Sequence, residues 1–228
     1  MNAAENVLEF YPIWVDLAGA ILGGILGAYA AARLGTDVTG ALIVAVVTGL
    51  GGGMIRDVLL QQGPPVALAS PWLLAAAAGA GLLTFLFSGH LHRLPGRRRI
   101  APFYVVVDAF FLAAWTVVGV AKGYAAGLPI VSCVFLGVLT AVGGGIARDV
   151  LLGRRPLILQ PGTLEAGAAL IGAAAQAAAT LLIGSLWGAL VGLVVVAAVR
   201  ILSLALRWQT RPARIVSADE PGDSRGAA

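Results

Sequence analysis

The sequence has little charge for its length. Only 11% of its 228 residues are Asp, Glu, Lys or Arg, against about a quarter in soluble globular proteins. Long runs of Ala, Leu, Val and Gly stand in place of the missing charge, and the mean hydropathy is +0.93. This composition excludes an ordinary soluble domain and indicates several membrane-spanning helices packed through small residues.

Cysteine and histidine are scarce as well. The single cysteine, Cys133, excludes an intramolecular disulfide and is expected to be an inert packing residue. His90 and His92 have no further ligands nearby in the sequence, so we expect no metal site. No Ser/His/Asp, HExxH, Walker-type or GxGxxG arrangement occurs, which argues against an enzyme and against a bound cofactor. The basic residues form short clusters without interleaved aromatics, which argues against nucleic-acid binding.

Seven apolar stretches are long enough to cross a bilayer, which requires about 20 residues per helix. They cover residues 12–33, 38–60, 71–90, 102–122, 129–152, 163–183 and 186–207. The last two are divided at IGSLWG (183–188), because the charge-free stretch 166–199 is too long for one helix. We therefore predict an all-α integral membrane protein, with residues 1–209 as one transmembrane domain and 210–228 as a disordered cytoplasmic tail.

The distribution of basic residues predicts how the chain crosses the membrane. The first ten residues lack the basic region of a signal peptide, so we expect the first span to act as its own insertion signal. With the N-terminus outside, the outer segments hold only Lys122. The inner segments then hold Arg33, Arg93, Arg97, Arg98, Arg99, Arg154, Arg155, Arg207, Arg211 and Arg214. This asymmetry predicts a multi-pass protein of the cell (inner) membrane with a cytoplasmic C-terminus.

One segment of the chain occurs twice. TGLGGGMIRDVLL (48–60) returns as TAVGGGIARDVLL (140–152), and the offset of 92 residues holds without a gap from Asp16/Asp108 to Pro64/Pro156. We assign repeat 1 to about 12–90, repeat 2 to about 102–183 and an unpaired seventh helix to about 186–207. Because a three-span unit copied in tandem enters the membrane from the other side, the two repeats should be inverted.

Each copy of the repeated segment carries three successive glycines within a span. They are Gly51, Gly52 and Gly53 in the first copy, and Gly143, Gly144 and Gly145 in the second. Each glycine costs a helix about 1 kcal/mol relative to alanine. We predict that both helices open there at mid-depth, face each other and offer carbonyl oxygens to a hydrophilic pathway. The alternative is that the glycines only let helices approach closely.

An Arg-Asp pair follows each triplet, and charged groups within a bilayer usually pair or face water. The pairs are Arg56-Asp57 and Arg148-Asp149. Neighbouring residues point about 100° apart on a helix, so we expect bridges to other helices rather than within each pair. Asp16 and Asp108 are the expected partners, through an arginine of their own or the opposite repeat. A direct role of these charges in permeation is the alternative.

Two further ionisable residues lie within or beside the spans. Lys122 corresponds to Ala30 in the repeat, so the symmetry does not require it. It could extend to the membrane interface or act as an electrostatic gate. Glu165, at the start of the sixth span, could pair with Arg154 and Arg155.

Two copies of GGG-x-x-RD, 92 residues apart in a seven-span chain, resemble the prokaryotic branch of the trimeric intracellular cation (TRIC) channel family. The resemblance covers about residues 10 to 207. It implies a homotrimer among membrane lipids, with a pore in each subunit that conducts potassium and sodium ions. The glycine-kinked second and fifth helices would line that pore, and Lys122 would take the gating role of a basic residue on the fourth helix.

The same bacterial sequences are also described as a glycine transporter family. A secondary transporter of glycine or another small amino acid is therefore the alternative function, since opened carbonyls suit a potassium ion and an ammonium group alike.

Overall fold

The computed structural model describes residues 13–93, 97–160, 164–206 and 208. Seven long helices run through these residues: α2 (Ile13–Ala32), α3 (Val38–Leu60), α5 (Pro71–Arg93), α6 (Arg97–Ala125), α7 (Ile130–Leu151), α8 (Glu165–Ile183) and α9 (Ser185–Ala205). All seven are long and apolar enough to span a membrane, which confirms the predicted fold. The predicted tail at 210–228 and the side chains of His90 and His92 lie outside the described part.

The helix ends follow local sequence signals. Asp37 caps α3, where its carboxylate accepts a hydrogen bond from the Gly40 N–H at 2.8 Å. Gly184 separates α8 from α9 with a φ of 90°, a conformation that favours glycine. The predicted division of the long apolar stretch at IGSLWG is therefore confirmed. The helix that contains the fourth span begins before the predicted span, because α6 starts at Arg97, whereas the span within it covers Val105–Ala125.

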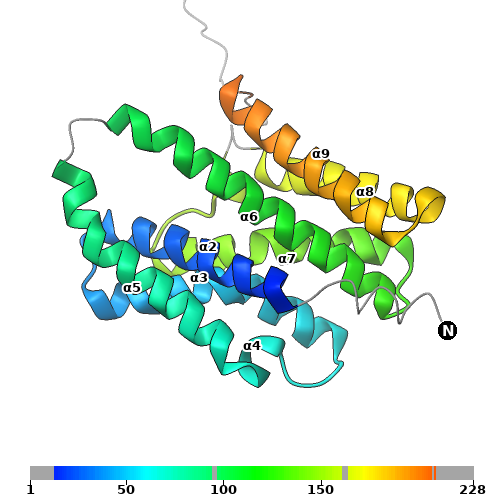
Figure 1. The fold of residues 1–228 in the computed structure, drawn as a ribbon, viewed down its shortest axis with the longest axis horizontal. Coiled ribbons are helices and arrows are strands. Elements are labelled where there is room, and N and C mark those ends of the chain that lie inside the picture. Colours follow the sequence, from blue (N-terminus) through cyan, green and yellow to red (C-terminus); the bar gives the residue numbers. More distant parts are fainter. Residues whose placement is uncertain (1–12, 94–96, 161–163, 207, 209–228) are drawn as a thin grey trace, which may run out of the picture.

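The helices pack as two three-helix units and one additional helix (Figure 1). Helices α2, α3 and α5 pack against one another, as do α6, α7 and α8, while α9 packs on α8 and α6. The two units meet through α3 with α7 and α2 with α6. In the view of Figure 1, α5 lies on one flank and the α8–α9 pair on the opposite flank. Of the seven spans, α6 has the largest buried share, 72%, so it is the central helix of the described bundle.

The two units run in opposite directions. Asp16 lies in the first turn of α2, and Lys122 lies in the last turn of α6, yet the Lys122 ammonium is 3.8 Å from an Asp16 carboxylate oxygen. At the other end, Ala30 near the end of α2 lines the same cavity as Asp149 near the end of α7. These contacts place α2 and α6 antiparallel, as the inverted repeat requires.

The loop after each repeated segment is built in the same way. The short helix α4 (Val66–Ala69) follows Pro65, and the 3-10 helix η1 (Leu157–Leu159) follows Pro156. The two prolines share nearly the same backbone angles, φ −51° and ψ 136° against φ −50° and ψ 137°. In the structure Pro156 therefore corresponds to Pro65 and not to Pro64, because the second loop is one residue shorter.

Candidate functional site

The glycine triplets lie within unbroken helices. Both α3 and α7 are α-helical throughout, including Gly51–Gly53 and Gly143–Gly145. The prediction that the helices open at the triplets is wrong for this structure. The prediction that the triplets face each other is confirmed, because a Cβ atom at Gly51 would lie 3.6 Å from the Cα atom of Gly144.

The glycines allow the two helix backbones to touch. A Cβ atom at Gly52 would collide with the carbonyl oxygen of Thr140 in α7, and one at Gly144 would collide with the carbonyl oxygen of Thr48 in α3. The contacts are reciprocal, as expected across a two-fold axis. We call this contact the glycine crossing. Because both helices continue without a break, their backbone carbonyls remain part of the helices and do not open to a pathway. Close approach of the two helices therefore explains the glycines here.

Buried charges gather at one end of the glycine crossing. In this first cluster, Arg56 is 2.8 Å from Asp57 and 3.5 Å from Asp16, measured between guanidinium nitrogen and carboxylate oxygen. The Lys122 ammonium lies 3.5 Å from Asp57 and 3.8 Å from Asp16. The Trp115 ring covers the guanidinium of Arg56, 5.6 Å from the ring centroid. Two carboxylates and two cations from α2, α3 and α6 thus form one neutral network.

A second cluster lies at the other end. Arg148 contacts Asp149 at 2.8 Å, and Arg200 donates to one oxygen of Asp108 through two nitrogens, at 2.8 and 3.0 Å. Glu165 is also buried here, within electrostatic reach of both arginines and both aspartates. Three carboxylates face two arginines, so this cluster carries one more negative than positive formal charge.

Each repeated Arg-Asp pair is bonded internally, contrary to the prediction, although in the first cluster Arg56 also reaches Asp16 of α2 and Asp57 also reaches Lys122 of α6. In each copy the arginine Nε donates to the Oδ1 atom of the next residue at 2.8 Å, for Arg56 to Asp57 and for Arg148 to Asp149. The Oδ2 atom of each aspartate accepts from the backbone N–H of Val66 or Leu157 at 3.0 Å. A flexible arginine can fold back over its neighbour, so the 100° separation does not keep the two groups apart. Each aspartate holds its arginine and fixes the following loop.

The expected partners of Asp16 and Asp108 are only half right. Asp16 pairs with Arg56 of its own repeat, as predicted. Asp108 pairs with Arg200 of α9, a helix outside both repeats. Arg200 was missed although it carries a clear signal, since it is an arginine within a predicted span. Trp115 was missed because its repeat counterpart is Gly23, and motif matching gives no weight to a position where the copies differ.

Glu165 does not pair with the loop arginines. Arg154 and Arg155 are exposed and form no ion pair with Glu165 within the described ranges. A Cβ atom at Gly145 would lie 3.6 Å from a carboxylate oxygen of Glu165 and 3.9 Å from the guanidinium of Arg148. The carboxylate therefore lies beside the third glycine of α7. Across the described part of the chain, no three His, Cys, Asp or Glu side chains gather as metal ligands would.

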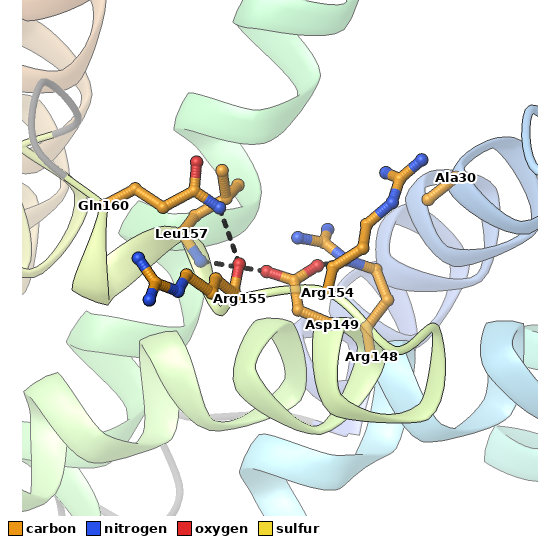
Figure 2. A pocket seen from close by; sticks show the side chains of 7 residues that line it. All are labelled: Ala30, Arg148, Asp149, Arg154, Arg155, Leu157 and Gln160. Atoms are coloured by element: carbon orange, nitrogen blue, oxygen red, sulfur yellow. Dashed lines mark hydrogen bonds and ion pairs between the residues drawn. The ribbon is translucent and has the colours of Figure 1, made fainter.

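A polar cavity of about 440 Å³ lies beside the second cluster. Figure 2 shows Arg148 and Asp149 along one side and Ala30 across from them, with the Arg154 side chain reaching toward Ala30. Gln160 closes another side, where its amide donates to the carbonyl oxygen of Arg155 at 2.6 Å. Ala30 is the counterpart of Lys122 in the repeat. A lysine at position 30 would therefore extend into this cavity.

Known proteins resemble this chain along most of its length. The inner membrane protein YadS of Escherichia coli is 35% identical over 200 residues, which are 87% of this chain and 93% of YadS. A membrane protein of Deinococcus radiodurans is 36% identical over 163 residues, 71% of this chain and 73% of that protein.

Solved structures share the fold as well. A TRIC trimeric intracellular cation channel orthologue from Rhodobacter sphaeroides is 32% identical with a TM-score of 0.76, over 85% of this chain and 97% of that one. A structure reported for conductance through TRIC cation channels is 30% identical with a TM-score of 0.78, over 90% and 98%. The family model described as "Glycine transporter" matches residues 13–89 and 105–181, which are the two repeats. The chain is therefore a member of this family, to which the TRIC channels also belong.

Proposed function

We propose that the protein is a potassium-permeable channel for monovalent cations, with a pathway in each subunit that joins the first cluster to the second. The observation that carries this proposal is the pair of buried charge clusters at opposite ends of one helix crossing. An ionisable side chain within a bilayer costs at least about 2.5 kcal/mol on insertion scales, and such residues mark ion pathways. Similarity to cation channels over about nine-tenths of the chain supports the same conclusion.

We propose that the structure represents a closed form of this pathway. The backbones of α3 and α7 touch at the glycine crossing, so we expect conduction along it to require these helices to separate. No side chain of Gly52 or Gly144 interlocks the two helices at their point of closest approach. We propose that α3 and α7 line the pathway and that the triplets are its narrowest part.

Lys122 is the proposed gate. Its ammonium lies between Asp16 and Asp57, where it balances the charge of both carboxylates together with Arg56. When this side chain swings away, the first cluster changes from neutral to a net negative charge and can attract a cation. Its side chain retains 19% exposure, which leaves it room to move.

The family and the loops support a particular arrangement in the membrane. Arg33, Arg154 and Arg155 all follow helices that end at the second cluster, so the positive-inside rule supports a cytoplasmic second cluster and an outer N-terminus. We propose the inner membrane as the location, by analogy with YadS. The trimeric orthologue supports a homotrimer surrounded by lipid.

A glycine transporter is the second candidate. The family description names this activity, and the arginines around the cavity suit the carboxylate of an amino acid. In that case the two repeats would alternate around one occluded site.

Electrical recording separates the two functions. Purified protein in a planar bilayer under a potassium chloride gradient should give single-channel steps that reverse near the potassium equilibrium potential. Absence of current, together with saturable uptake of labelled glycine into liposomes that hold the same protein, would establish the transporter instead.

A further inference from the structure

The polar cavity beside the second cluster carries more positive than negative charge. Three of the side chains that line it are arginines, Arg148, Arg154 and Arg155, and its one carboxylate among the described residues is Asp149. Three arginines and one carboxylate give the lining a formal charge of +2. Both oxygens of Asp149 already have partners, the Nε of Arg148 at 2.8 Å and the N–H of Leu157 at 3.0 Å. The charge of the two loop arginines, Arg154 and Arg155, is therefore not balanced within the cavity.

The two loop arginines stand on a backbone that is fixed to the end of α7. The N–H of Arg154 donates to the carbonyl oxygen of Asp149 at 2.8 Å, and the side-chain amide of Gln160 donates to the carbonyl oxygen of Arg155 at 2.6 Å. Figure 2 shows that the Arg154 side chain extends from this loop toward Ala30. In the part of the chain that the structure describes, neither loop arginine forms an ion pair with a carboxylate. An anchored backbone lowers the entropy that these side chains lose when they bind a ligand.

The shape of the loop does not require these arginines. The corresponding loop of repeat 1, residues 61–65, contains no charged residue, yet Pro65 and Pro156 adopt nearly the same backbone angles. The positive-inside rule accounts for basic residues on the inner side of a membrane, but it does not require a cavity between them. Arginine presents its N–H groups in a rigid fork that matches the oxygen atoms of a phosphate group, and such charge-assisted hydrogen bonds are about twice as strong as neutral ones. The excess positive charge, the cavity and the anchored loop together suit an oxyanion.

We propose that this cavity binds a phosphate group, which Arg154 and Arg155 hold while Arg148 remains paired with Asp149. At about 30 Å³ per water molecule, a volume of about 440 Å³ accommodates the group together with several water molecules. The phosphate comes from a free anion in the aqueous phase or from a lipid headgroup, because both present the same oxygen atoms. This site goes beyond the proposed channel function and does not depend on it, since binding is measured without any current.

Calorimetric titration of the purified protein with sodium phosphate tests for the free anion. In a neutral detergent at constant ionic strength, we expect saturable binding to the wild type and affinity at least roughly tenfold lower in R154Q/R155Q. Both arginines are exposed, so their replacement should leave the melting temperature unchanged. A30L, which narrows the cavity without a change of charge, should also weaken the binding of phosphate.

The matched control for the single variant R154Q is R33Q. It removes the same charge from an exposed arginine that follows α2 at the same end of the bundle and does not line the cavity. R33Q should keep the affinity of the wild type, whereas R154Q should lose several-fold. Equal losses in the two variants would show a diffuse attraction to positive charge and would overturn the proposal.

Native mass spectrometry tests for the lipid headgroup. The protein is released from nanodiscs of phosphatidylcholine with phosphatidylglycerol, and the phosphatidylglycerol that stays bound is counted. Retention by the wild type and R33Q, but not by R154Q/R155Q, would assign the phosphate to a lipid, whereas saturable binding in the calorimeter without such retention would assign it to a free anion. If the wild type binds phosphate in neither form, the proposal is wrong. Heat from a titration with glycine, with none from phosphate, would also overturn it and would favour the transporter.

Discussion

The two charge clusters share one repeated unit and the matched aspartates Asp16 and Asp108, and they differ in the other residues around that unit. In both, an arginine donates to the adjacent aspartate at 2.8 Å, and the same aspartate accepts a loop N–H at 3.0 Å. The first cluster adds Lys122 and Trp115, whereas the second adds Arg200 and Glu165. The repeated motif is therefore the scaffold, and the residues outside it give each end its own chemistry. An inverted repeat of structure does not imply an inverted repeat of function.

The largest expected effect comes from Arg200, which belongs to the second cluster alone. R200M leaves the Asp108 carboxylate buried without its partner, and removal of one member of a buried pair costs about 3–5 kcal/mol. Thermal unfolding in detergent, followed by tryptophan fluorescence, should show a large loss of stability. K122M should destabilise much less, since Arg56 still contacts both aspartates of the first cluster. Equal melting temperatures for R200M and the wild type would contradict the proposed role of this pair.

Substitution of the central glycines should affect both repeats equally. G52A and G144A each place a methyl group against a backbone carbonyl of the opposite helix, and overpacking of this kind costs about 1–3 kcal/mol. G51A and G145A are the matched controls, because their nearest neighbours would lie at 3.6 Å, an ordinary contact. These controls should be neutral or stabilise the helix by up to about 1 kcal/mol. The melting temperatures of the four variants test this prediction. Equal losses of stability in G51A and G52A would rule out the glycine crossing as described.

A smaller effect is expected from Glu165, the unmatched carboxylate. E165Q removes the excess negative charge of the second cluster, and the local concentration of cations there should fall. We expect single-channel potassium conductance to decrease roughly twofold at low ionic strength and less at high salt. E165D keeps the charge and should conduct nearly as the wild type does. Equal currents in E165Q and wild type would show that this carboxylate lies off the pathway.

Much of the fold follows from the sequence because it depends on patterns that extend over many residues. The thickness of the bilayer sets the lengths of the spans. The turn after Ile183 requires the backbone freedom of a glycine, and duplication produces the offset of 92 residues. The charged contacts depend on rotamers and on helix rotation, which a motif does not encode. The closed pairing of Arg56 with Asp57 is one such contact, and the partner of Asp108 is another.

The glycine triplets form continuous helix despite the low helix propensity of glycine. Three glycines weaken an isolated helix, yet here α3 and α7 support each other through the very contact that the missing side chains allow. Tertiary packing overrides the local preference. Gly52 and Gly144 carry this contact, whereas a Cβ atom at Gly51 or Gly145 would make only ordinary van der Waals contacts, a distinction that the identical letters of a triplet do not reveal.

The most direct test measures the potassium currents of K122A beside those of the wild type and K122R in symmetric potassium chloride. It asks whether Lys122 makes the first cluster differ in function from the second. Without the ammonium between Asp16 and Asp57, the first cluster is no longer neutral, so the channel should open more often and at lower voltage. K122R keeps the charge and should gate much like the wild type. If K122A opens no more often than the wild type while its melting temperature is preserved, the first cluster is only a structural network and the proposed gate is wrong.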